Sequence, residues 1–152
     1  MLYLNNKTES IEEKERVSHK QIVKVYHADT DCYNVVWHGS YIKWFEIGRV
    51  ELVNLAKLDI ESLEKDQGVT FPVIELNIKY KNAAKLYDEL LIESSINNIS
   101  KLSIDFSHKV TNNKTKQTIV IANAKIVVLK EAKLLRKIPE DIYEAFSNLV
   151  VD

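Results

Sequence analysis

Cysteine, proline and glycine are scarce in this sequence, which has one cysteine, two prolines and three glycines among 152 residues. The single cysteine, Cys32, excludes an intrachain disulfide and fits a reducing compartment. The few glycines form no glycine-rich phosphate loop, so a P-loop or a dinucleotide-binding fold has no support. Long apolar runs are missing as well, since stretches such as residues 126–129 are far too short to span a membrane.

An excess of either charge is also missing, because 21 lysines and arginines stand against 22 aspartates and glutamates, a formal net charge of −1. This balance argues against a nucleic-acid-binding protein that neutralises many phosphates, but it leaves room for a local basic pocket. The content of 45% hydrophobic and 28% charged residues is ordinary for a soluble globular protein, and the length fits one domain over residues 1–152. Residues 1–16 turn polar too early for a signal peptide and predict a loose arm, so we expect a cytoplasmic protein.

The apolar residues predict a strand, a long helix and then further strands. Residues 17–26 alternate in part, as in a strand, and residues 39–57 carry apolar side chains around most of a helix, as in a buried one. Gly48, costly inside a helix, predicts a close approach of this helix to a sheet. A short helix over residues 60–67 follows, and Pro139 opens a last one. Between these two helices, strand-like runs cover residues 70–81, 89–98, 101–111 and 117–130. This order indicates an α+β protein in which an antiparallel sheet wraps a long central helix.

The stretch most informative about chemistry covers residues 29–46 and reads DTDCYNVVWHGSYIKWFE. It places Asp29, Asp31 and His38 around the turn from a strand into the long helix. A helix N-terminus gathers unpaired N–H groups and partial positive charge. A carboxylate beside that pole could act on a carbonyl group that the pole polarises, which is the arrangement that acyl transfer needs.

An Asp-x-Asp pair also has other interpretations. The spacing of Asp29 suits a turn-closing hydrogen bond, and Asp31 could cap a turn or the helix. The pair could instead belong to a metal-binding sugar-nucleotide transferase, but no second cluster of ligands supports that and the chain is short for such an enzyme. Taken alone, the pair does not decide between these roles.

The same stretch resembles the signature of the hotdog-fold acyl-coenzyme A thioesterases of the 4-hydroxybenzoyl-CoA type. That signature reads roughly Asp-x-Asp, a small or aromatic pair, Gly-Val-Val, an aromatic residue, His or Tyr, x-x-Tyr and an aromatic pair with Glu. The similarity extends over residues 20–147 and includes the segments 71–75 and 136–140. It implies a hotdog fold, which has the α+β description reached from periodicity. Asn34 stands where the family has glycine, and asparagine is the residue best able to replace glycine at a positive φ.

The resemblance implies hydrolysis of an acyl-CoA, with an aromatic or short-chain acyl group, to the free acid and coenzyme A, without a metal or redox cofactor. Asp31 matches the catalytic carboxylate, as a nucleophile on the thioester carbon or as a general base for water. His38 matches the residue at the helix start whose backbone N–H helps to polarise the thioester carbonyl. Tyr41 and Glu46 belong to the same signature and are candidate substrate-binding residues.

Several of these residues have a second possible role beside the one that the resemblance implies. Glu46 could reach the active site of a neighbouring subunit, or pair with Lys43 or Arg49 at helical spacing. The densest basic stretch could meet the phosphates of coenzyme A or guard a strand edge; it contains Lys79, Lys81 and Lys85. Cys32 is expected to be a small packing residue, because the neighbouring carboxylate disfavours the thiolate that a cysteine nucleophile needs. Core positions are favoured for three aromatic residues that could otherwise be acyl-pocket walls: Trp37, Trp44 and Phe45.

The resemblance also implies a homo-oligomer, either a dimer or a tetramer, because a lone hotdog subunit exposes one sheet edge and holds half a ligand site. Two other functions stay open. One is a hotdog dehydratase or hydratase, in which His38 and Glu46 would act on opposite sides of a β-hydroxyacyl group. The other is a module that binds acyl-CoA without turnover.

Overall fold

The computed structural model describes residues 17–150, so the arm predicted over residues 1–16 lies outside the described residues. In chain order the elements are β1 (Ser18–Lys24), a 3-10 helix (His27–Asp29), α1 (His38–Leu55), α2 (Ile60–Gln67), β2 (Val69–Thr70), β3 (Val73–Tyr80), β4 (Glu89–Ile99), β5 (Ser103–Asn112), β6 (Thr118–Val127), β7 (Leu129–Lys130), β8 (Lys133–Leu134) and α3 (Glu140–Ser147). No helix within this described part is long and apolar enough to cross a membrane.

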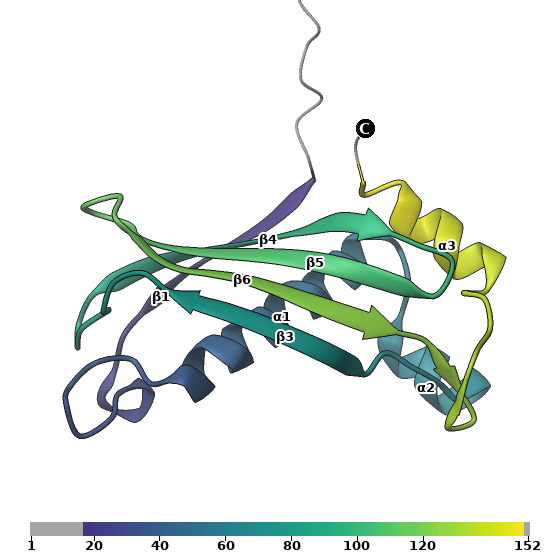
Figure 1. The fold of residues 1–152 in the computed structure, drawn as a ribbon, viewed down its shortest axis with the longest axis horizontal. Coiled ribbons are helices and arrows are strands. Elements are labelled where there is room, and N and C mark those ends of the chain that lie inside the picture. The colour runs from purple at the N-terminus through teal and green to yellow at the C-terminus, as the bar shows by residue number, and fades with distance from the viewer. Residues whose placement is uncertain (1–16, 151–152) are drawn as a thin grey trace, which may run out of the picture.

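A five-stranded antiparallel sheet and the helix α1 dominate the structure. The strands follow the order β1–β4–β5–β6–β3, and α1 lies against one face of the sheet (Figure 1). The strands β4, β5 and β6 bury every second residue toward α1, which is the pattern of a sheet with one covered face. The predicted α+β arrangement, a sheet around a long helix, is therefore confirmed.

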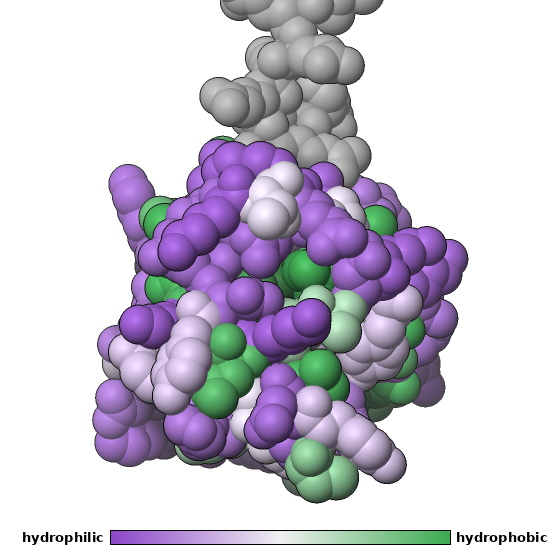
Figure 2. Space-filling model, turned by 90° about the vertical axis from the view of Figure 1, so that its left-hand side faces the viewer, coloured by the Kyte–Doolittle hydropathy of each residue, from purple (hydrophilic) through white to green (hydrophobic). Residues whose placement is uncertain are grey.

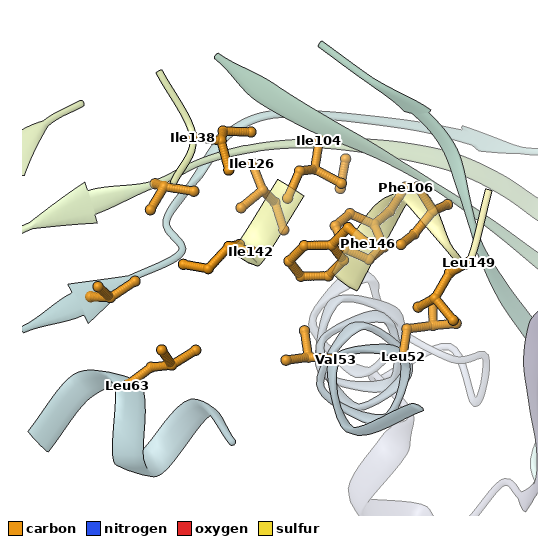
Figure 3. Packing of buried hydrophobic residues seen from close by; sticks show 14 residues of the cluster. Leu52, Val53, Leu63, Ile104, Phe106, Ile126, Ile138, Ile142, Phe146 and Leu149 are labelled. Atoms are coloured by element: carbon orange, nitrogen blue, oxygen red, sulfur yellow. The ribbon is translucent and has the colours of Figure 1, made fainter. Parts of the chain in front are cut away.

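Apolar packing fixes α1 on the sheet at both of its ends. At the C-terminal end, Leu52 and Val53 of α1 pack with Phe106 of the sheet and with Ile142 and Phe146 of α3 (Figure 3). The rings of Phe106 and Phe146 meet edge to face, with centroids 6.4 Å apart. At the N-terminal end a second cluster joins Tyr41, Trp44 and Phe45 of α1 to strand residues such as Leu90 and Ile92. The start of the helix is thus held by its own buried aromatic side chains.

Gly48 lies where α1 packs closely against the sheet, as predicted. A Cβ atom at this position would lie 2.1 Å from the Ser94 hydroxyl oxygen and 2.8 Å from Ser94 Cβ. Any larger residue would push the helix away from β4. The absence of a Cβ atom at Gly48 therefore allows the short distance between the helix and β4.

The helix spans and strand positions follow the sequence prediction closely, with one addition. α2 covers the predicted residues 60–67 and ends at Gly68, which has a φ of 64°. The predicted strand over residues 70–81 is interrupted at Phe71 and Pro72, since proline has no N–H to donate. The separated β2 joins β7 and β8 in a second, three-stranded sheet that the sequence did not predict. Strands of two residues are too short to show an alternating pattern.

Candidate active site

The loop between the 3-10 helix and α1 closes on itself. Thr30 and Val36 form an antiparallel bridge, and the Asp31 N–H donates to the Val35 carbonyl at 3.0 Å. The two ends of the loop therefore lie side by side just before α1 begins. This closure holds Asp31 opposite Val35, three residues before α1 begins.

Asn34 makes the tight part of this loop possible. Its φ is 58°, the left-handed region that asparagine tolerates better than other residues with a side chain, and its N–H donates to the Asp31 carbonyl at 3.0 Å. The predicted positive φ at Asn34 is confirmed. The replacement of the family's glycine therefore keeps the turn.

The Asp31 carboxylate is exposed, and only one of its two oxygens accepts a hydrogen bond from the described residues. Its Oδ1 accepts the Tyr33 N–H at 2.8 Å, which fixes the direction of the side chain. Its Oδ2 has no hydrogen-bond partner within residues 17–150. One oxygen thus orients the group while the other stays available to a ligand or a water molecule. Figure 2 shows this end of the molecule, a mostly hydrophilic surface with separate hydrophobic residues between the polar ones.

The start of α1 leaves its positive end open. Trp37 precedes the helix in an extended conformation without a side-chain cap. The N–H groups of His38 and Gly39 have no acceptor in the described part of the chain. The Trp37 ring lies against Gly39, where a Cβ would come within 2.2 Å of the ring. Two unpaired N–H groups therefore lie at the start of the helix, at the end of the loop that contains Asp31, where a carbonyl or carboxylate oxygen could accept them.

Asp29 is structural, as predicted. Its Oδ2 accepts the Tyr26 N–H at 2.9 Å, and its carbonyl accepts the Ser40 hydroxyl at 3.1 Å. Both groups of Asp29 thereby tie the loop to its neighbours. Among the described residues, no group of three or more His, Cys, Asp and Glu side chains is placed to hold a metal ion, so the metal-binding interpretation of the pair gains no support there.

A cavity of about 340 Å³ adjoins the loop and brings two predicted substrate-binding residues together. Its lining includes Val35 and Val36 of the loop, Tyr41 of α1, and Tyr80 and Lys81 at the end of β3. The Tyr41 side chain is 2% exposed, and burial raises the pKa of its phenol well above the ordinary value. The hydroxyl therefore stays protonated at neutral pH and can donate a hydrogen bond.

The three lysines of the basic stretch do not share one surface. Lys81 lines the cavity, and Lys85 forms an antiparallel bridge with Val35 of the loop. Lys79 lies on β3, where Leu76 and Ile78 pack toward α1 and Lys79 is exposed on the other face. Only Lys81 and Lys85 therefore lie close to the loop.

Glu46 lies away from Asp31 and His38 within one chain. It is eight residues along α1 from His38, roughly 12 Å at the rise of an α-helix. Within residues 17–150 it forms no ion pair within 4.0 Å, although burial lowers the pKa of the Arg49 guanidinium and the charge of Glu46 raises it against that effect. Glu46 and Arg49 instead line a second cavity of about 370 Å³.

Arg49 binds a buried polar pair that the sequence did not single out. Its Nη1 lies 3.3 Å from Nε2 of His108, and Nδ1 of His108 lies 2.7 Å from the Ser94 hydroxyl. His108 and Ser94 are each 1% exposed. Burial and then the charge of Arg49 lower the pKa of His108 to about 3, so its ring is neutral. A guanidinium can only donate, which makes Nε2 the acceptor and Nδ1–H the donor to Ser94. Ser94 and His108 are therefore not a nucleophile and its base, because the ring has no nitrogen free to take the serine proton.

Three other sequence interpretations can be compared with the structure. Trp44 and Phe45 are buried, as expected for core residues. Trp37 is 43% exposed, so its predicted core position is wrong, and it lies over the start of α1 instead. Cys32 is exposed and does not pack, because the loop turns its side chain to solvent. His38 is exposed as well, with its ring edge to face against Trp37.

Comparison with known proteins identifies the class. Residues 33–119 match the sequence pattern of the thioesterase superfamily. The match covers more than half of the chain and contains most of the loop, all of α1 and the cavity residues. This chain belongs to the thioesterase superfamily.

Individual relatives agree with this assignment. The acyl-CoA thioesterase YbgC of Haemophilus influenzae is 30% identical over 130 residues, which are 84% of this chain and 93% of that protein. A 1,4-dihydroxy-2-naphthoyl-CoA thioesterase from Synechocystis has a similar structure, with a TM-score of 0.77, 18% identity and coverage of 88% of this chain and 98% of the other. A mutant 4-hydroxybenzoyl CoA thioesterase complexed with 4-hydroxybenzoyl CoA gives a TM-score of 0.73 at 18% identity, covering 84% and 97% of the two chains. The hotdog fold implied by the sequence is confirmed.

Proposed function

We propose that this protein is an enzyme that hydrolyses an acyl-CoA thioester to the free acid and coenzyme A. The observation that carries the proposal is the loop geometry. Asp31, whose carboxylate has one oxygen without a partner in the described residues, belongs to the loop that leads into α1, and the first N–H groups of α1, on His38 and Gly39, have no acceptor there. The match to the thioesterase superfamily supports the reaction type.

In this mechanism the thioester carbonyl oxygen accepts hydrogen bonds from the N–H groups at the start of α1. These groups and the helix dipole stabilise the negative charge that develops on this oxygen when the carbonyl carbon is attacked. Asp31 either takes a proton from the attacking water or attacks the carbon itself. The C–S bond then breaks, and the thiolate of coenzyme A leaves and takes up a proton. In the second route, water afterwards hydrolyses the anhydride that links the acyl group to Asp31.

The surroundings of Asp31 support the roles of the neighbouring residues. Tyr41 has a protonated hydroxyl in the cavity beside the loop, so it is proposed to contact the acyl group. Lys81 and Lys85, on the same side, are proposed to meet phosphates of coenzyme A. Lys79 fits that role less well, because it lies on the other face of β3.

We also propose that the protein is a cytoplasmic homo-oligomer. The cytoplasmic location is supported by the single exposed cysteine, Cys32, which suits a reducing compartment. The strand β3 forms an edge of the five-stranded sheet, and its exposed apolar residues Val73, Ile74 and Tyr80 favour pairing with another chain. Such pairing could also bring Glu46 of one chain to the active site of another, since Glu46 has no ion pair within the described residues.

A panel of acyl-CoAs tests the proposed reaction against its alternatives. The panel contains aromatic acyl groups, including hydroxybenzoyl and dihydroxynaphthoyl, and short aliphatic ones. We expect release of free thiol, with kcat of about 1 s⁻¹ or more for the best substrate. Loss or gain of water without thiol release would instead identify a dehydratase or hydratase. Binding of every member without any reaction would identify a non-catalytic module.

The geometry of the turn predicts opposite effects for two substitutions of Asn34. Asn34→Gly should leave stability and activity unchanged or slightly improved, because glycine adopts a positive φ freely. Asn34→Val should cost about 1–3 kcal/mol in the free energy of unfolding, because a β-branched residue is strained there. It should also lower kcat, because the turn directs Asp31. Urea unfolding and thiol release measure the two effects. Equal stability and rates for both variants would contradict the role assigned to this turn.

A further inference from the structure

The turn between β3 and β4 is closed by Asp88. Its Oδ2 accepts the Lys85 N–H at 2.9 Å, and its own N–H donates to the Lys85 carbonyl at 3.0 Å. Asp88 therefore binds both backbone polar groups of Lys85. The Asp88 carbonyl in turn accepts the N–H of Val25, the residue that follows β1, at 2.9 Å. The turn is thus attached to the end of β1 through the same residue that closes it.

Tyr87, inside this turn, has a strained backbone. Its φ is 69°, in the left-handed region that a residue with a bulky side chain rarely adopts. It occupies the third position of the four-residue turn from Lys85 to Asp88, where a positive φ normally requires glycine. Such strain persists only where the surroundings hold it, and it is typical of functional sites. Here it is held by the bonds of Asp88 and by the Tyr87 N–H, which donates to the Val25 carbonyl at 2.9 Å.

The turn also supports the loop that leads into α1. Residues 34–36 of the loop and residues 84–86 lie side by side as antiparallel segments, centred on the bridge between Val35 and Lys85. Two hydrogen bonds join the segments, from the Val36 N–H to the Ala84 carbonyl at 2.9 Å and from the Leu86 N–H to the Asn34 carbonyl at 3.3 Å. In this type of pair the N–H and carbonyl of Lys85 point away from Val35. Asp88 therefore binds Lys85 from the side opposite to the loop.

The other side of Val35 leads to Asp31. The Val35 carbonyl points away from Lys85 and accepts the Asp31 N–H at 3.0 Å. A row of backbone contacts thus connects Asp88 with Lys85, then with Val35, and then with Asp31. The position of Asp31 therefore depends on the turn that Asp88 closes.

We propose that Asp88 is a positioning residue for the catalytic carboxylate: by holding Lys85 it keeps the loop, and with it Asp31, in place for the reaction. The inference rests on the proposed function, and Asp88 acts through residues 84–86 without contact to the substrate. Loss of its carboxylate leaves the Lys85 N–H without its acceptor and releases the strained turn. The loop then loses its support, and a displacement of about 1 Å at a catalytic group can lower the rate about 10²-fold.

Amide hydrogen exchange of the full chain tests this support without any need for turnover. In Asp88→Ala we expect the amide hydrogens of Asp31, Val36 and Leu86 to exchange about tenfold faster or more, the factor that one hydrogen bond to a charged group supplies. In Asp88→Asn the amide oxygen can still accept the Lys85 N–H. Exchange in this variant should therefore stay within about threefold of the unmodified protein.

Asp59→Ala is the matched control. The Asp59 carboxylate also accepts a backbone N–H, that of Ser62 at 3.2 Å, but it does so at the start of α2. Its removal should lower the urea midpoint, as the loss of any helix cap does. It should leave the exchange of the three loop amides and the kcat for thiol release unchanged. This control separates the effect of Asp88 on the loop from a general loss of stability.

Thiol release from the best acyl-CoA separates a positioning role from a structural one. Asp88→Ala should lower kcat about tenfold or more and change KM by less than about threefold, whereas Asp88→Asn should keep about half of kcat or more. In the Asp31→Asn background Asp88→Ala should lower kcat by less than about twofold, because the carboxylate that it positions is already lost.

Three results would contradict the role of Asp88. They are unchanged exchange of the loop amides in Asp88→Ala, an unmodified kcat for that variant, and a further tenfold loss of kcat in the Asp31→Asn background. A failure of the proposed function would be recognised separately, because the unmodified protein would then release no thiol from any acyl-CoA. Faster exchange in Asp88→Ala would even then support the hold of Asp88 on the loop.

Discussion

Asp31→Asn is expected to lower kcat for thioester hydrolysis by about 10²–10⁴-fold while the protein stays folded. The amide keeps an oxygen that can accept the Tyr33 N–H, so the loop retains its shape. It removes the negative charge that both a general base and a nucleophile require. Thiol release with the best acyl-CoA measures kcat, and urea unfolding measures the stability of the variant.

Asp29→Asn is the matched control for this substitution. Asp29 lies two residues away and also accepts a backbone N–H, from Tyr26, but it has no proposed contact with the substrate. We expect this control to keep most of its activity. A value of kcat above about a tenth of the unmodified rate for Asp31→Asn would remove Asp31 from the proposed mechanism.

A single turnover in ¹⁸O-labelled water separates the two roles of Asp31. If Asp31 activates water, the label enters the released acid in the first turnover. If Asp31 attacks the thioester, water attack at the aspartyl carbon of the anhydride leaves the label on Asp31, and the first acid released is unlabelled. Mass spectrometry of the acid and of the Asp31 peptide distinguishes these outcomes.

Acidification is expected to destabilise the protein through His108. Its pKa is about 3 in the folded protein and about 6.5 in the unfolded chain, so the unfolded chain binds the proton more strongly. The stability due to the neutral ring is therefore present above about pH 6.5 and is lost as the pH falls toward 3. At pH 4.5 the loss due to His108 should be about 2–3 kcal/mol.

The variant His108→Gln isolates this contribution from that of the carboxylates. Its amide oxygen can accept from Arg49, but the side chain does not titrate. Urea unfolding at pH 7 and pH 4.5 gives the loss of stability for each protein. The unmodified protein should lose about 2–3 kcal/mol more than the variant. Equal losses would show that His108 is protonated as readily in the folded protein as in the unfolded chain.

Local chemistry made several features predictable from the sequence. The span of α2 followed from its short helical pattern and the glycine that ends it, and Asn34 followed from the few residues that accept a positive φ. Gly48 was informative because glycine destabilises the interior of a helix and is expected there only where the backbone packs closely, here against Ser94. The pattern over residues 29–46 indicated both the family and the likeness of Asp31 to a catalytic carboxylate. The end of α2, the turn at Asn34 and the pattern over residues 29–46 depend on backbone conformation or on nearby residues, so the order of residues contains them, whereas only the structure shows that Gly48 faces Ser94.

The tertiary structure decided the features that depend on register and on the side of a strand. The contact of Arg49 with His108 joins residues 59 positions apart, which helical spacing along α1 does not show. Lys79 and Lys81 are two residues apart, a spacing that puts side chains on one face of a continuous strand, but β3 ends at Tyr80 and Lys81 lines the cavity instead. The hydrogen bond between Ser94 and His108 exists only because β4 lies beside β5. Strand order is set by packing around α1 across the whole chain, and no local stretch of sequence contains that information.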